Sequence, residues 1–195
     1  MKPSRWQGSR SVGLLLLLAA GVPQAVATPP DDYWNTLQSL CGKAYEGRLV
    51  LSPPGDDSFS GKKLVMHVRS CTPRQIRIPF FVGEDRSRTW VLTRSGERLQ
   101  LQHDHRHADG SSDDITLYGG TSSNRGSERA QLFPADDATA QMLPTAHANV
   151  WMMEVERDKV FAYHLQRLGT ERLFRIEFDL SRDIEPPAAP WGWRD

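Results

Sequence analysis

Three histidines at alternate positions, His103, His105 and His107, are the residues of this sequence best suited to chemistry. Side chains of a β-strand point to opposite faces with a period of two, so a strand would place all three imidazoles on one face. Neutral imidazoles bind zinc and other divalent transition metals. The triplet therefore predicts a site for such a metal, with Asp109 as a further ligand, or a site for a small molecule.

The residues between these histidines point the other way on a strand. Asp104 and Arg106 are then candidates for the shell around the site, where Asp104 or a backbone carbonyl would orient an imidazole ring. The alternative is structural. Leu99 and Leu101 share the histidine face, so the strand could fill the core with its leucines and then pass the rim, where the histidines would meet water.

Known catalytic motifs are not met around the triplet. In the metallo-β-lactamase pattern, His-x-His-x-Asp-His, an Asp and a His would stand where this chain has His107 and Ala108. A cupin pattern would need a glutamate shortly after His-x-His. Ser111 and Ser112 lack the GxSxG setting of α/β-hydrolases. We therefore assign no catalytic residue and favour a binding module. The alternatives are a metal-dependent hydrolase at the same residues and an envelope interaction or stress protein.

The elements that must position the triplet are mostly strands. Residues 31–42, DDYWNTLQSLCG, have apolar residues at helical spacing and predict one short helix. From Ala44 onward the period is two, interrupted by turn clusters such as Ser52–Asp57. This pattern predicts an all-β fold, an antiparallel up-and-down β-barrel of about nine to ten short strands. Pro79, which lacks an N–H, predicts an edge or a bulge in its strand.

The barrel loosely resembles the calycin type, the shape of lipocalins and fatty-acid-binding proteins. The lipocalin Gly-x-Trp signature is absent, because the corresponding region reads GKAYEG. The likeness therefore concerns architecture and implies no activity. We expect one domain over residues 28–184 and a Pro- and Trp-rich tail over residues 185–195, whose Trp191 and Trp193 fold back onto the surface.

The first 27 residues have the pattern of a secretory signal peptide. Three basic residues precede the apolar run VGLLLLLAA, and AVA provides small residues for cleavage after Ala27. The run is shorter than the roughly 20 residues that span a bilayer. We therefore expect a periplasmic or secreted protein with no stable membrane anchor after cleavage.

Charge and cysteine content limit the partners. Loss of residues 1–27, with their three basic and no acidic side chains, would change the formal net charge from 0 to −3. A mildly acidic chain has no bulk attraction for nucleic acid. Cys41 and Cys71 predict one disulfide in an oxidising compartment, which would stabilise the fold by about 3–4 kcal/mol. We expect a small ligand or a metal ion as partner.

Several motifs, among them LCGKAYEGRLV, GEDRSRTWVLTR, LQHDHRHADGS and NVWMMEV, resemble a family of exported bacterial proteins with no assigned activity. The motifs extend over nearly the whole of the chain after residue 27. The resemblance implies export and a single domain, and it carries over no catalytic residue.

Overall fold

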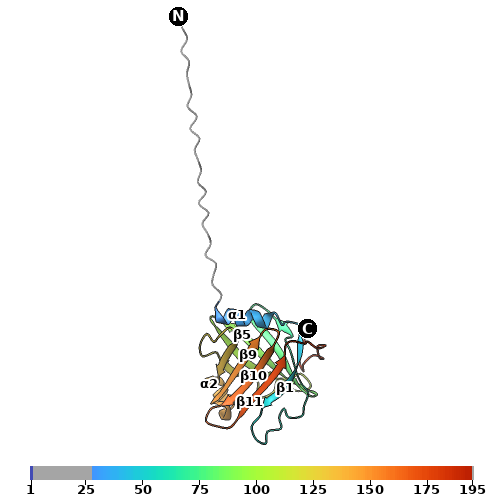
Figure 1. The fold of residues 1–195 in the computed structure, drawn as a ribbon. Helices are drawn as coiled ribbons and strands as arrows, with labels where there is room; N and C mark the ends of the chain where they lie inside the picture. The colour runs from blue at the N-terminus through green and yellow to red at the C-terminus, as the bar shows by residue number, and fades with distance from the viewer. Residues whose placement is uncertain (2–27, 195) are drawn as a thin grey trace.

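The computed structural model describes residue 1 and residues 28–194. The predicted signal peptide and its cleavage after Ala27 therefore lie outside the described residues, apart from Met1. A single antiparallel sheet is nearly closed into a barrel, with a short helix at one end (Figure 1). The predicted all-β fold class and strand number are confirmed, since ten strands follow one another around the sheet and an eleventh, of two residues, pairs beside them.

The strands are the main regular structure of the described chain. Their bounds are β1 Ala44–Leu51, β2 Leu64–His67, β3 Ser70–Cys71, β4 Gln75–Val82, β5 Asp85–Ser95, β6 Arg98–His105, β7 Tyr118–Thr121, β8 Ala130–Pro134, β9 Asn149–Glu156, β10 Val160–Arg167 and β11 Leu173–Asp179. The helices are α1 Pro29–Gln38, α2 Asp137–Met142 and the 3₁₀ turn η1 Pro144–Ala146.

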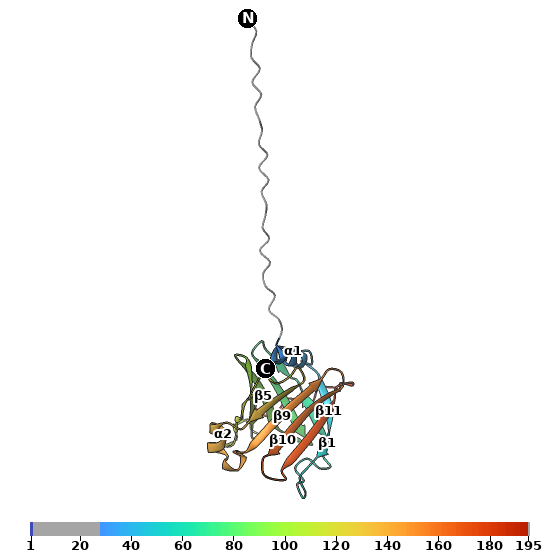
Figure 2. The same cartoon turned by 60° about the vertical axis from the view of Figure 1, so that its left-hand side comes forward.

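Around the barrel the order is β7-β6-β5-β4-β2-β1-β11-β10-β9-β8, and every neighbouring pair is antiparallel. Strands that follow one another in sequence are therefore neighbours in space, as expected for an up-and-down barrel. The first and last strands, β1 and β11, pair with each other within the sheet. The barrel closes instead between β7 and β8, the two end strands of this order, and α2 packs against β7. Figure 2 shows α2 at the end of the barrel opposite α1.

This closure depends on two glycines and one threonine. The hydroxyl of Thr139 donates to the carbonyl oxygen of Gly119 at 2.8 Å and accepts from the N–H of the same residue at 2.7 Å. A Cβ on Gly120 would lie 1.8 Å from the carbonyl oxygen of Pro134. Only glycine therefore permits the two edge strands to approach this closely.

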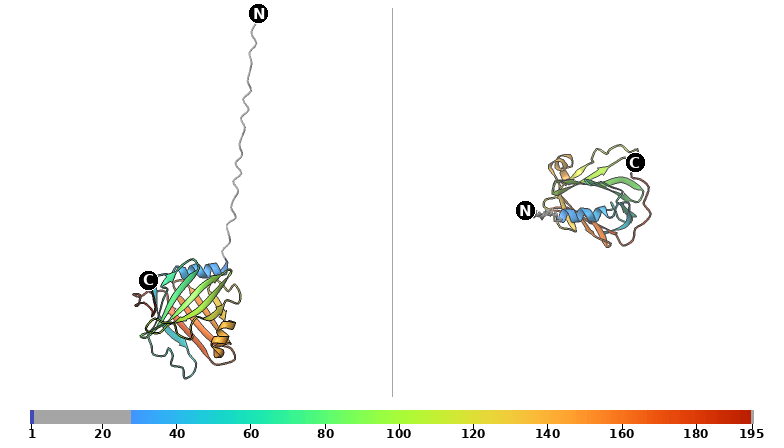
Figure 3. Two further views of the ribbon diagram at one scale, coloured as in Figure 1. Left: turned by 180° about the vertical axis from the view of Figure 1, so that it is seen from behind. Right: turned by 90° about the horizontal axis from the view of Figure 1, so that it is seen from above.

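Helix α1 covers one end of the barrel, as seen from above in Figure 3. Tyr33, Trp34 and Leu37 form its buried face. The N-terminus differs from the prediction, because Thr28 is the N-cap and the Asp31 carboxylate accepts from the Thr28 N–H at 3.0 Å. That arrangement is one half of a capping box. We call this the helix end of the barrel, and the opposite one the open end.

One covalent link and two polar links hold α1 in place. The predicted disulfide between Cys41 and Cys71 is confirmed and joins the segment after α1 to β3. Asp31 forms an ion pair with Arg94 near the end of β5, and the Arg157 guanidinium donates to the Ser39 hydroxyl at 3.0 Å.

Strand β4 is not an edge strand, because it pairs with β5 on one side and with β2 and β3 on the other. Its pairing with β2 ends at Met66 and Phe80 and resumes with β3 at Ser70 and Arg77. Pro79 lies in this interruption, which accommodates a residue without an N–H. Of the two predicted alternatives for this strand, the edge is wrong. The local interruption of pairing at Pro79 is closer to the predicted bulge.

The C-terminal tail folds back onto the outer face, as predicted. Directly before the tail, the N–H of Ile184 donates to the carbonyl oxygen of Ala44. Within the tail, the N–H of Trp191 donates to the carbonyl oxygen of Arg86. The guanidinium carbon of Arg77 lies 5.7 Å from the ring centroid of Trp193. The tail thus covers part of the outside of the barrel.

Candidate functional site

His103 lies inside the barrel, on the inward face of β6. Only 4% of the residue is exposed, so the interpretation of a histidine that reaches water at the rim is wrong for this position. Its ring stacks on Tyr118, with centroids 4.7 Å apart and planes 8° apart. The prediction that the histidines continue the inward face of Leu99 and Leu101 is confirmed for His103, which pairs with the inward-facing Trp90.

Both ring nitrogens of His103 have hydrogen-bond partners. Nδ1 lies 3.1 Å from the backbone carbonyl oxygen of Tyr118, and Nε2 lies 2.9 Å from the hydroxyl oxygen of Tyr163. A carbonyl oxygen only accepts, so Nδ1 carries the proton and Nε2 accepts from Tyr163. Burial lowers the pKa of His103 to about 3 and raises that of Tyr163 well above its ordinary value. The pair is therefore neutral at physiological pH.

His105 is half-buried and lies one step closer to the open end. Its Nε2 hydrogen-bonds to the hydroxyl of Tyr118 at 3.2 Å. Burial, and then the nearby positive charge of Arg88, lower the pKa of His105, and burial raises the pKa of Tyr118 to about 12. Two histidine–tyrosine pairs thus follow each other along the inner wall of the barrel.

The other predicted ligands lie elsewhere. Strand β6 ends at His105, and His107 and Asp109 are exposed in the loop that follows. The Asp109 carboxylate accepts from the N–H and the hydroxyl of Ser111 at 2.9 and 2.6 Å. Among the residues that the structure describes, no three or more His, Cys, Asp or Glu side chains are grouped closely enough to hold a metal ion. The structure therefore brings together His103 and His105 alone.

Asp104 and Arg106 lie on the outer face, as the period of two requires. The buried Asp104 carboxylate accepts from the guanidinium groups of Arg77 and Arg106 at 2.6 and 2.8 Å. Of the two groups predicted to orient a ring, a backbone carbonyl does so for His103, since Nδ1 hydrogen-bonds to the carbonyl oxygen of Tyr118. Asp104 instead links β6 to β4 beneath the C-terminal tail.

A cavity of about 240 Å³ opens beside the two histidines at the open end. We call it the open-end cavity. Aromatic side chains are the largest group among its lining residues, and they are Phe59, Phe80, Trp90, Tyr118, Trp151, Tyr163 and Phe174. Trp90 stacks between Phe80 and Tyr163, with centroid distances of 4.7 and 4.6 Å. The floor of the cavity is therefore a set of rings held in place by their mutual packing.

Three arginines surround the entrance of this cavity: Arg88 of β5, Arg167 of β10 and Arg172 of the turn before β11. We call them the entrance arginines. Arg88 forms an ion pair with Asp85, and Arg172 lies 3.2 Å from the Asp56 carboxylate. Neither carboxylate lines the cavity, and among the described lining residues every charged side chain is an arginine.

The loop between β1 and β2 covers part of the entrance. The ring of Phe59 packs against Phe80 and Phe174, with centroids 5.7 and 5.3 Å away. The contact between Asp56 and Arg172 joins the same loop to the turn before β11. The cavity is therefore bounded by the barrel wall on its sides and by a surface loop above.

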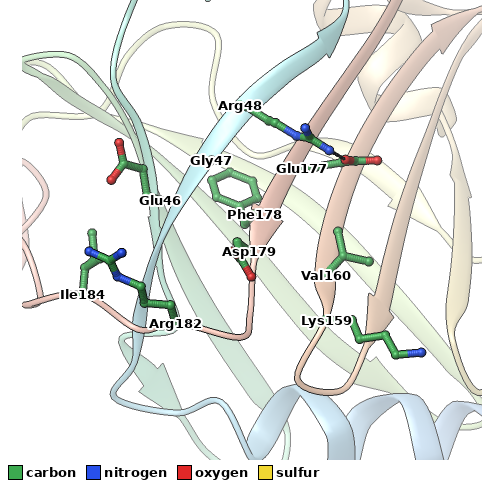
Figure 4. Close-up of a pocket in the computed structure, with 10 residues that line it drawn as sticks. All are labelled: Glu46, Gly47, Arg48, Lys159, Val160, Glu177, Phe178, Asp179, Arg182 and Ile184. Atoms are coloured by element: carbon green, nitrogen blue, oxygen red, sulfur yellow. Dashed lines mark hydrogen bonds and ion pairs between the residues drawn. The ribbon is translucent and has the colours of Figure 1, made fainter.

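A broader depression of about 640 Å³ lies on the outer surface, beside β1 and β11 (Figure 4). Arg48 and Glu177 lie 2.8 Å apart there, across neighbouring strands, while Lys159 points away from them (Figure 4). Charges of both signs line this wide surface. It lacks the enclosure of the open-end cavity, so we place the candidate site inside the barrel.

Sequence reasoning missed the entrance arginines and the two tyrosines. They belong to different strands and to one turn, so no short motif contains them. A signal was nevertheless present, because Arg88 stands two residues before Trp90 and Arg167 two residues after Leu165. Residues two apart on a strand share a face, so each arginine continues an inward-facing row.

Comparison with protein-family models, with curated proteins and with solved structures gives no match for this chain. The resemblance to a family of exported bacterial proteins stays a prediction. Within the described part of the chain, no helix is sufficiently long and apolar to cross a membrane.

Proposed function

We propose that this chain is an exported binding protein that holds a small molecule in the open-end cavity, with His103 and His105 in the wall. The observation that carries this proposal is the cavity itself, an aromatic pocket of about 240 Å³ inside a barrel whose other end is covered by α1. Small-molecule sites are concave, mostly apolar and fitted with a few convergent polar groups, and the mouths of β-barrels are a common place for them.

The donor set of the cavity suits an organic ligand better than a metal ion. His103 would have to give up its hydrogen bond with Tyr163 to offer Nε2, and His105 shares its Nε2 with Tyr118. Among the described residues that line the cavity, none carries a carboxylate or thiol that could complete a coordination shell. Tyrosine hydroxyls and imidazoles instead provide fixed hydrogen-bonding groups for an uncharged or anionic molecule.

A cavity-filling variant tests the proposal. Leu165 lines the cavity, so Leu165→Trp would occupy part of its volume, whereas Leu132→Trp would place the same side chain at an exposed position of β8. We would screen a library of small aromatic and aliphatic compounds by saturation-transfer NMR. We expect compounds that bind the unmodified chain and Leu132→Trp, and lose at least about tenfold in affinity for Leu165→Trp, a factor of ten being about 1.4 kcal/mol.

Far-UV circular dichroism and the unfolding temperature would verify that both variants are folded. Binding that is equal in Leu165→Trp and Leu132→Trp would place the ligand outside the barrel and refute the proposal. A library without any binder would refute it as well.

A further inference from the structure

We infer that the ligand of the open-end cavity is a small aromatic organic anion, whose ring lies among the aromatic side chains and whose negative group meets the entrance arginines. The inference rests on the proposed function and adds to it a ligand class. Its basis is a cavity with an aromatic floor, an entrance of three guanidinium groups, and a described lining in which no acidic side chain takes part.

Arg167 provides the most direct argument for an anionic ligand. Its Nε donates to the Asn149 side-chain oxygen at 2.9 Å, and none of the ion pairs among the described residues includes it. Burial, and then the charge of Arg172, lower the pKa of Arg167. Two like charges face the same entrance, and a carboxylate between them would relieve their repulsion.

The other two entrance arginines are held in position by acids outside the cavity. Asp85 binds Arg88, and Asp56 binds Arg172. These ion pairs fix where the guanidinium groups lie and leave N–H groups for a ligand, since each guanidinium has five donors. Planar guanidinium groups match the two oxygens of a carboxylate and form charge-assisted hydrogen bonds with it.

The aromatic floor determines the other half of the ligand. Trp90, Tyr163 and Trp151 lie deeper than the arginines, and each is at most 6% exposed. Aromatic rings bind one another with about 0.5–1.5 kcal/mol beyond the burial of their area. The volume of about 240 Å³ is below the roughly 300–1,000 Å³ of drug-sized sites, which limits the ligand to one or two fused rings.

The test compares two probes of nearly the same shape, 2-naphthoate and its neutral amide, 2-naphthamide. Isothermal titration calorimetry with the unmodified chain should show naphthoate to bind at least about tenfold more tightly, since hydrogen bonds to charged groups contribute about 1.5–3 kcal/mol. The advantage should shrink as salt is added. A third probe, octanoate, has the charge without the ring and should bind more weakly than naphthoate.

Arg167→Gln supplies the residue-level test, with Arg157→Gln as matched control at the helix end. We expect Arg167→Gln to weaken naphthoate about tenfold and naphthamide less than twofold, while Arg157→Gln changes neither. Equal binding of naphthoate and naphthamide by the unmodified chain would overturn the anion inference and leave the cavity as a neutral binding site. If neither naphthalene probe binds while other compounds in the library do, the aromatic inference fails and the proposed function stands.

Discussion

Replacement of His103 by glutamine should remove a large part of the acid sensitivity of this fold. The pKa of His103 falls from 6.5 to about 3 because the imidazole is buried. Below pH 6.5 the unfolded chain therefore takes up a proton that the folded chain does not bind. The free energy of unfolding must then decrease as the pH falls through this range, and the loss continues down to about pH 3.

The size of the effect follows from the same two values. At pH 7 the unfolded histidine is mostly neutral and the contribution is close to zero. At pH 5 it is about 2 kcal/mol, because each pKa unit corresponds to about 1.36 kcal/mol. Burial also lowers the pKa of His67 and His105, so both add a loss of the same sign. We expect the unmodified chain to lose at least about 2 kcal/mol between pH 7 and pH 5.

Urea unfolding at pH 7 and pH 5, followed by circular dichroism with the disulfide intact, measures this loss. Glutamine keeps a donor and an acceptor at position 103 but does not titrate, so His103→Gln should lose about 2 kcal/mol less than the unmodified chain over this interval. His107→Gln is the control, because it removes an exposed histidine outside the cavity. If the free energy of unfolding falls equally with pH in His103→Gln and in the unmodified chain, the conclusion that His103 is neutral in the folded protein is refuted.

Four further variants address the barrel that surrounds the cavity. The double variant Cys41→Ala/Cys71→Ala should lower the free energy of unfolding by about 4 kcal/mol, measured by urea unfolding, since the bond closes a loop with a sequence separation of 30. Gly120→Ala, with its Cβ 1.8 Å from a carbonyl oxygen of β8, should cost more than about 3 kcal/mol in the same assay. Gly83→Ala, at a φ of +60° with open space around it, should cost only about 1–2 kcal/mol. Asp104→Asn should lower stability by about 2 kcal/mol and make it less dependent on salt, and an unchanged unfolding midpoint would contradict the ionic link between β6 and β4.

The strands could be predicted from the sequence because their signal is local. Alternation from Ala44 onward marks which residues face inward, and turn clusters mark where each strand ends. The predicted start of this alternation at Ala44 coincides with the first residue of β1. The disulfide was equally accessible, since two cysteines allow one intramolecular pairing. Pro79 shows the limit of local reasoning. Whether a strand is an edge depends on which other strands pair with it, and the local sequence does not specify them.

The cavity could not be predicted in the same way, because its residues come from seven strands and three connecting segments. The histidine triplet was recognised for its spacing, but spacing gives only the shared face. Whether a histidine on that face lies inside the barrel or in solvent depends on how far β6 extends before the barrel ends. The structure places that end at His105, so the second histidine marks the entrance and the third lies beyond it.

One gradient of polarity accounts for both the fold and the site. The inward-facing side chains of β6 change from leucine to histidine over Leu99–His105, and those of β10 change from phenylalanine to arginine over Phe161–Arg167. Both strands run from the helix end to the open end, so apolar packing is concentrated beneath α1 and positive charge at the entrance. The histidine–tyrosine pairs lie between these regions. Each pair is joined by a hydrogen bond, and removal of one member would leave its partner without that bond. The polar layer is therefore a coupled unit, and it allows a barrel with an apolar interior to end in a cavity that is suited to a charged ligand.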